Sequence, residues 1–183
     1  EIKMAKRKYY RTLDKIRTPV EILNVLTGGG LSLGKISEFW GRNRSGKSTA
    51  ALQTAQYFLE DYPEGRIVII DSEANYSDGS RLEKVFNLHP HNGELEVVKE
   101  DPRVWLFYIA TIEEAIATAI KFSKESKDQE IPTLILIDSL SALVPSRDAE
   151  ELHKSIEKGK MANQYAGGMA LTPRILASSM SHL

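Results

Sequence analysis

The segment Lys35–Ser48, KISEFWGRNRSGKS, decides the fold of this chain. Its second half, Gly41–Ser48, matches the pattern G-x-x-x-x-G-K-[ST] at every fixed position. Glycines let the backbone turn tightly and direct successive N–H groups at phosphates, while the start of the following helix adds unpaired donors. The segment therefore predicts a strand over Lys35–Trp40, a phosphate-binding loop (P-loop), and a helix from Lys47 to about Glu60.

The same motif predicts which side chains hold the nucleotide. We expect Lys47 to reach the β- and γ-phosphates of ATP, as a binding and catalytic group, and the Ser48 hydroxyl to ligate Mg²⁺. The predicted nucleotide-binding residues are Gly41, Arg42, Asn43, Arg44, Ser45, Gly46, Lys47, Ser48 and Thr49. The alternative is a glycine-rich turn with an exposed lysine, which the strand–loop–helix context disfavours.

Downstream of the loop, short β-type runs alternate with amphipathic helices. The expected strands are Arg66–Asp71, Val104–Ile109 and Thr133–Asp138. One helix is expected near Arg81–Phe86, and another begins after Thr111, where Glu114 completes a capping-box pattern. This alternation predicts the α/β class, with a mostly parallel central sheet flanked by helices.

Carboxylates follow two of the expected strands, at the edge where open α/β sheets bind ligands. Asp138 ends the apolar run Leu134–Ile137, and we expect it in the Mg²⁺ shell; the alternative is a cap for the next helix. Glu73 follows a similar strand end and is suited to orient and deprotonate an attacking water. The alternative for Glu73 is an ordinary surface carboxylate.

Composition narrows the class of protein. The chain has 183 residues, a formal net charge of −1 and no cysteine, which excludes disulfide scaffolds and cysteine-ligated metal sites. No apolar run approaches the roughly 20 residues of a membrane span, so we expect a cytoplasmic protein without a membrane partner. Residues 1–17 carry seven basic and two acidic side chains. They form either a solvated helix face or a contact with DNA or a neighbouring subunit.

Four blocks of the sequence resemble the RecA-like strand-exchange recombinases, and the spacing between them fits as well. The blocks are Thr27–Thr49 (TGGGLSLGKISEFWGRNRSGKST), Ile69–Ala74 (IIDSEA), Leu134–Pro145 (LILIDSLSALVP) and Met169–Met180 (MALTPRILASSM). The resemblance implies a RecA-like P-loop NTPase fold and a DNA-dependent ATPase that uses Glu73 as its catalytic base. We expect a basic N-terminal segment over residues 1–17 and the ATPase core over residues 18–183.

The resemblance also implies partners. It suggests a filament on single-stranded DNA that promotes homologous pairing and strand exchange in DNA recombination and repair. Ser146–Gly168 would be the first DNA loop, and Arg174 would contact phosphate unless it is a plain helix-surface charge. The alternatives are a hexameric motor that forms a ring, such as a DnaB-like helicase or a KaiC-like ATPase, and a nucleotide-binding module without turnover.

Some features depart from the family pattern. Arg42 and Arg44 lie where cellular relatives usually carry uncharged or acidic residues, and they either add phosphate contacts or point to solvent. The turn after Glu73 is longer than in bacterial RecA, so the residues that flank adenine stay unassigned, with Asp78 and Arg81 nearby. This drift resembles a bacteriophage recombinase of the UvsX kind, which would act in the host cytoplasm. The family continues with further strands, a γ-phosphate sensor and a second DNA loop, so we expect a C-terminally truncated core.

Overall fold

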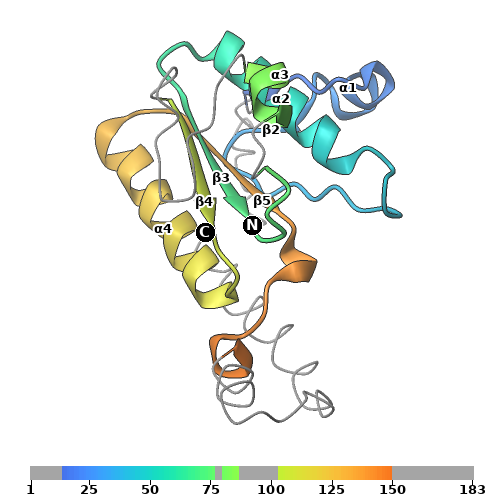
Figure 1. The fold of residues 1–183 in the computed structure, drawn as a ribbon. Coiled ribbons are helices and arrows are strands. Elements are labelled where there is room, and N and C mark those ends of the chain that lie inside the picture. Colours follow the sequence, from blue (N-terminus) through green and yellow to red (C-terminus); the bar gives the residue numbers. More distant parts are fainter. Residues whose placement is uncertain (1–13, 77–79, 87–102, 150–183) are drawn as a thin grey trace, which may run out of the picture. The chain divides into compact units, whose positions relative to one another are not determined.

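A computed structural model describes residues 14–76, 80–86 and 103–149 of the chain. The chain divides into two compact units, residues 1–61 and residues 62–183, and each is described by itself. The first unit contains β1 (Lys15–Ile16), α1 (Glu21–Thr27), β2 (Leu31–Ser32) and α2 (Lys47–Asp61); the last three are labelled in Figure 1. The boundary predicted after residue 17 stays a prediction, because residues 1–13 lie outside the described part.

A small antiparallel ribbon opens the first unit, with Lys15 paired to Ser32 and Ile16 to Leu31. Gly30 makes this pairing possible, since a Cβ atom there would lie 2.0 Å from the carbonyl oxygen of Ile16. Any side chain at this position would force the two strands apart. Within the run Gly28–Gly30, Gly30 therefore serves the ribbon, whereas Gly28 forms the C-cap of α1.

The predicted strand Lys35–Trp40 is wrong: the structure gives this segment no regular secondary structure. Two of its large apolar side chains are exposed, Ile36 by 57% and Trp40 by 87%, and Phe39 is half-buried. A β-type sequence becomes a strand only where a neighbouring strand pairs its backbone groups. Within the described residues, no strand pairs with this segment, so its β propensity does not produce a strand.

Helix α2 confirms the predicted helix and runs one residue beyond its expected end. Its buried residues are Ala51, Leu52, Thr54, Ala55, Phe58 and Leu59. Arg17, just after β1, pairs with Asp61 at 2.8 Å and lies over the ring of Tyr57, with 4.9 Å from its guanidinium carbon to the ring centroid. These contacts fasten the ribbon to the last turn of α2.

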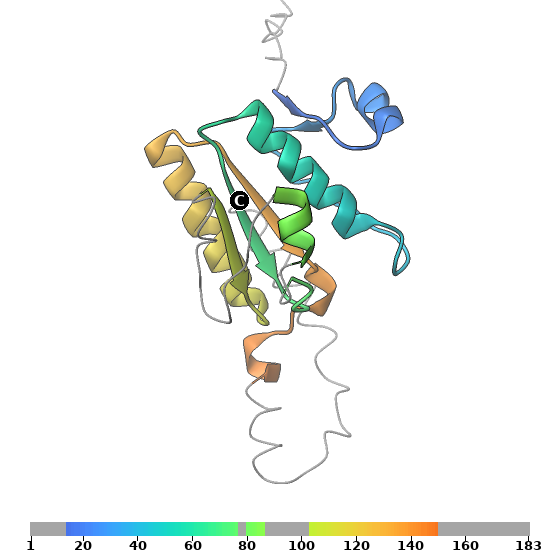
Figure 2. The ribbon, with the colours of Figure 1, turned by 45° about the horizontal axis from the view of Figure 1, so that its top comes forward.

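The second unit is built on a parallel sheet of three strands in the order β4-β3-β5. Its elements are β3 (Arg66–Asp71), α3 (Ser80–Phe86), β4 (Val104–Tyr108), α4 (Ile112–Gln129), β5 (Thr133–Asp138) and a 3-10 helix, η1 (Leu140–Ala142). In Figure 2 the sheet ends where η1 leaves β5. The predicted α/β class and parallel sheet are confirmed, and only β4 is one residue shorter than expected.

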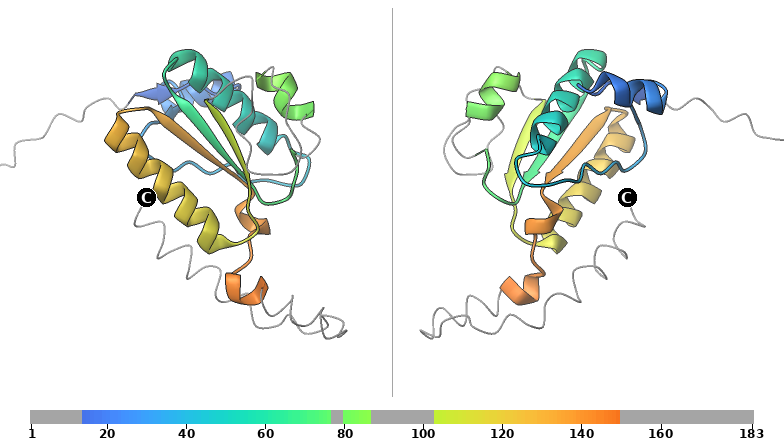
Figure 3. Two further views of the ribbon diagram at one scale, coloured as in Figure 1. Left: turned by 60° about the vertical axis from the view of Figure 1, so that its left-hand side comes forward. Right: turned by 90° about the vertical axis from the view of Figure 1, so that its right-hand side faces the viewer.

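The core of this unit lies between the sheet and α4, which run alongside each other in Figure 3. The central strand is fully buried from Ile67 to Ile70, as its continuous apolar sequence indicates. Phe122 of α4 packs against Trp105 and Phe107 of β4, with ring centroids 5.4 and 5.5 Å away. Among the described residues, no helix combines the length and apolar character needed to cross a membrane.

The capping box expected at the start of α4 does not form. Thr111 occupies the N-cap position with extended backbone angles, but its side chain makes no capping hydrogen bond. The segment after β5 takes over instead, because Val144 O accepts from Ile112 N at 3.0 Å and Val144 N donates to Ala110 O at 3.0 Å. A pairing distant in sequence has replaced the local cap.

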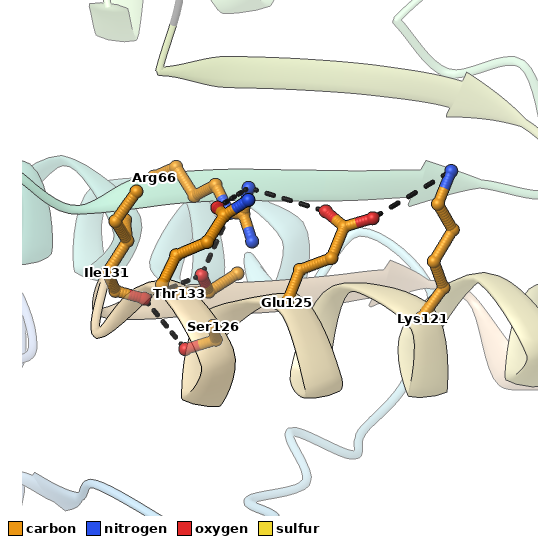
Figure 4. A network of polar contacts seen from close by, with 7 residues as sticks. Arg66, Lys121, Glu125, Ser126, Ile131 and Thr133 are labelled. Carbon is orange, nitrogen blue, oxygen red and sulfur yellow. Dashed lines mark hydrogen bonds and ion pairs between the residues drawn. The ribbon is translucent and has the colours of Figure 1, made fainter.

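The amino-terminal ends of the strands are joined through Arg66, as Figure 4 shows. Its Nε donates to Thr133 Oγ1 of β5 at 3.0 Å, and its Nη1 lies 3.5 Å from Glu125 Oε2 of α4. The guanidinium also covers the ring of Phe122, 5.2 Å from the centroid. One side chain thus contacts both β5 and α4 at this end of the sheet.

Candidate functional site

The P-loop of the first unit, Gly41–Ser48, turns tightly and enters α2 at Lys47. Arg44 and Gly46 adopt left-handed backbone conformations, with φ of 61° and 89°. The turn is closed locally, since Ser45 N donates to Arg42 O at 3.2 Å. Side chains from Gly41 to Gly46 are exposed. The loop is therefore a compact turn at a helix start, the backbone form that suits an anion.

Lys47 lies back over this loop. Its Nζ donates to the carbonyl oxygens of Gly41 at 3.0 Å and Arg42 at 3.1 Å. The ammonium is held by the loop itself, beside backbone that is rich in N–H donors. A positive charge fixed in this way suits a phosphate ligand, and Ser48, half-buried in the first turn of α2, adds a hydroxyl.

The second unit carries a group of polar side chains where β3 and β5 end. We call it the strand-end cluster; its members are Asp71, Ser72, Glu73, Tyr76, Asp138 and Ser139. The parallel register places Asp71 directly opposite Asp138. Ser72 then joins the two strand ends, because its Oγ donates to Ser139 O at 2.7 Å and accepts from Ser139 N at 2.8 Å.

Asp71 shapes the turn that follows β3. It is only 1% exposed, and its carboxylate accepts the backbone N–H groups of Glu73 at 3.1 Å and Tyr76 at 2.9 Å. A buried carboxylate is tolerated only when it is hydrogen-bonded, so these two bonds fix the path of the turn. The sequence pattern alone indicated no role for Asp71, although an aspartate that bonds the backbone two residues on is a known turn former.

Glu73 is exposed, and its carboxylate is oriented by two side chains. Oε1 accepts from Ser139 Oγ at 2.6 Å, and Oε2 accepts from Asn75 Nδ2 at 3.3 Å. A carboxylate offers about four acceptor positions, and a general base uses one of them to take the proton of a water. The arrangement is suited to a general base held in one orientation.

Asp138 is held by a tyrosine. The Tyr76 hydroxyl donates to Asp138 Oδ2 at 2.5 Å, while Oδ1 has no hydrogen-bond partner among the described residues. Burial raises the pKa of Tyr76, and the bond to Asp138 raises it further, so the phenol stays protonated at neutral pH. A carboxylate with one oxygen open is the type of ligand that Mg²⁺ takes, and serine hydroxyls suit the same ion.

The structure thus brings Glu73 and Asp138, each predicted from its position after a strand, into one hydrogen-bonded cluster. It also adds residues that the sequence did not single out, namely Tyr76, Ser72 and Ser139. Their bonds join residues that are separated by 62 to 67 positions in the sequence. No local sequence pattern predicts such a pairing. Arg81 is exposed on α3.

Several predicted features lie outside the described residues. They are residues 1–13 of the basic segment, Asp78, the first DNA loop beyond residue 149, the block Met169–Met180 and Arg174. Ser146, where the loop was expected to begin, is described. Its N and Oγ donate to Glu113 Oε2 of α4 at 2.9 and 2.7 Å. Burial raises the pKa of Glu113, but bonds from Ser146 and the backbone outweigh it and lower the pKa overall.

Comparison with known proteins finds recombination proteins. The chain is 31% identical to Protein RecA of Mycoplasma genitalium over 161 residues, 84% of this chain and 40% of that protein. It is 26% identical to Protein RecA of Malacoplasma penetrans over 158 residues, 86% of this chain and 41% of the relative. These similarities support a RecA-like family. No family model matches.

A third RecA-like relative is the DNA repair and recombination protein RadA of Methanoculleus marisnigri, 28% identical over 175 residues. That match covers 90% of this chain and 48% of RadA, so the chain spans less than half the length of each relative. The parallel sheet with its packed helix agrees with a RecA-like α/β fold. At the level of the family, the similarities agree with the RecA-like resemblance of the four sequence blocks.

Proposed function

We propose that this chain is the ATPase core of a DNA recombinase, which binds Mg·ATP and hydrolyses it. The observation that carries the proposal is the orientation of Glu73 by Ser139, directly after Asp138 at the end of β5. In this proposal residues Gly41–Thr49 bind the phosphates, with Lys47 at the β- and γ-phosphates. Ser48 and Asp138 hold the metal, and Glu73 is the catalytic base.

The proposed reaction is attack by water on the γ-phosphorus of ATP. Glu73 accepts a proton from the water as its oxygen bonds to phosphorus, and the bond from the γ-phosphorus to the bridging oxygen breaks. The electron pair of that bond leaves with ADP, and Lys47 stabilises the charge that develops on the phosphate oxygens. Mg²⁺, when bound, neutralises part of the same charge.

We propose single-stranded DNA as the partner, bound by a filament of subunits that promotes homologous pairing and strand exchange. The similarity to RadA, a DNA repair and recombination protein, supports a role in these processes. The first DNA loop would start at Ser146, and Arg174 would contact phosphate. The cysteine-free sequence agrees with action in the cytoplasm, which is the host cytoplasm if the protein is a UvsX-type viral recombinase.

Two measurements test the proposal. ATP hydrolysis of the full-length protein, followed with and without single-stranded DNA, is expected to rise when DNA is present. Negative-stain images with single-stranded DNA and a slowly hydrolysed ATP analogue are expected to show filaments. Closed rings would favour the hexameric motor instead. Nucleotide binding without turnover, even with DNA, would leave only a binding module.

A further inference from the structure

We propose that Tyr76 is a positioning residue for Asp138, a role that rests on the proposed function of Asp138 in the metal shell. Tyr76 has no exposed surface, and its hydroxyl lies 2.5 Å from Asp138 Oδ2. The two residues come from different strand ends of the same sheet, β3 and β5. Their bond fixes the carboxylate from the side opposite its open oxygen.

The position of Tyr76 is itself determined by the turn after β3. Asp71, at the end of β3, accepts the Tyr76 backbone N–H through its buried carboxylate at 2.9 Å. The ring is fully enclosed, which leaves the hydroxyl little freedom. Tyr76 therefore links the residue that ends β3, through its backbone N–H, to the side chain of Asp138 at the end of β5.

Such a bond matters because the terminal torsion of an aspartate is broad when nothing restrains it. With Oδ2 engaged by Tyr76, the carboxylate has one preferred orientation, and Oδ1 is the oxygen left for a metal ion or its water. Partners that orient a metal ligand typically change metal affinity by about 10–100-fold when they are removed. We therefore expect Tyr76 to strengthen Mg²⁺-dependent nucleotide binding.

A purely structural explanation starts from the tyrosine instead: a buried hydroxyl needs an acceptor, and Asp138 supplies it. The two explanations differ in what the loss of the hydroxyl changes. The structural one predicts lower stability alone. The positioning role predicts a change in the Mg²⁺ concentration at which nucleotide binds.

The test uses Tyr76→Phe in the full-length protein, because phenylalanine keeps the buried ring and removes only the hydroxyl. Binding of a fluorescent ATP analogue is titrated with Mg²⁺ and also measured in EDTA. We expect binding in EDTA to be unchanged and the Mg²⁺ midpoint to rise about tenfold, the lower end of the usual range. Tyr57→Phe on α2 is the matched control, since its ring still lies under Arg17, and it should leave the midpoint unchanged.

An Asp138→Asn background separates this inference from the proposed function. If Asp138→Asn raises the midpoint and Tyr76→Phe adds nothing further, both proposals are supported. If Asp138→Asn raises it but Tyr76→Phe alone only lowers the thermal midpoint of the protein, the positioning role is overturned and the metal assignment stands. An unchanged Mg²⁺ midpoint in Asp138→Asn would overturn both.

Discussion

The P-loop and the strand-end cluster are organised in opposite ways. Lys47 bonds to residues five and six positions away, and the P-loop side chains before it are exposed. The strand-end cluster is joined by bonds that span more than sixty positions, around a carboxylate only 1% exposed. The P-loop is formed by residues that are neighbours in sequence, so a sequence pattern predicts it, and it contributes little to the fold. The strand-end cluster joins residues distant in sequence, so no local sequence pattern predicts its bonds, and it forms only when the chain is folded.

The largest expected effect is at the exposed edge of the cluster. Glu73→Gln keeps the size and much of the hydrogen bonding but cannot take a proton, so turnover should fall by about 10²–10⁴-fold. ATP affinity should change little, and ATP-dependent DNA binding should persist or last longer. Steady-state hydrolysis and DNA retention are measured together, with the exposed Glu64→Gln as control. Wild-type turnover would make Glu73 a surface carboxylate.

Next in size is a change in the P-loop. Lys47→Ala removes a charged donor, and hydrogen bonds from charged groups contribute about 1.5–3 kcal/mol, so nucleotide affinity should fall by roughly 10–100-fold. Fluorescent-nucleotide titration measures this, with Lys35→Ala as the matched control. The unfolding midpoint should stay at the wild-type value, because the bonds that are lost lie at the surface. A variant that binds normally would remove Lys47 from its predicted role.

The contrast between the two regions is sharpest for stability. Ser72→Ala deletes two bonds between the ends of β3 and β5, and we expect the free energy of unfolding to fall by about 1–3 kcal/mol. Asn43→Ala, in the P-loop, should change it by less than about 0.5 kcal/mol. Urea unfolding followed by circular dichroism measures both. Equal losses in the two variants would contradict the difference drawn between the regions.

The smallest expected effect lies just beyond the cluster. Ser146→Ala removes the hydroxyl bond to Glu113, so the pKa of that carboxyl should rise towards its ordinary value. Because the folded-state pKa is depressed, the contribution of Glu113 to stability is present above its unfolded pKa and is lost as the pH falls through the folded one. An NMR titration of the Glu113 side chain checks this shift. Ser37→Ala should leave the titration unchanged.

The same contrast explains which elements of the fold could be predicted from the sequence and which could not. Strands β3 and β5 were predicted with their observed bounds, because continuous apolar runs ended by Asp71 and Asp138 are strong local signals. The predicted strand Lys35–Trp40 failed because pairing is a property of the neighbours, which the segment does not encode. The capping box at Thr111 did not form either: its side chain makes no capping bond, and the backbone of the distant Val144 pairs with the start of α4.

The site follows this pattern. Glu73 and Asp138 were predicted as site residues from their positions after strands, and the parallel register brings those strand ends together. Their roles stay predictions. Tyr76 could not be found, because a lone tyrosine in a turn is indistinguishable from a surface residue until the fold places its hydroxyl beside a carboxylate. The roles of the P-loop residues stay predictions that the variants above are designed to test.

The two carbonyl bonds of Lys47 have a consequence for selectivity. The carbonyl oxygens of Gly41 and Arg42 occupy two of the three N–H donors of this ammonium. A ligand that bonds more than the third donor exchanges with a carbonyl, and the free energy of that exchange is the difference between the new bond and the old one. A neutral oxygen offers no advantage over a peptide carbonyl, whereas an anionic oxygen does. The loop thereby discriminates by charge before any contact with a base or sugar is made.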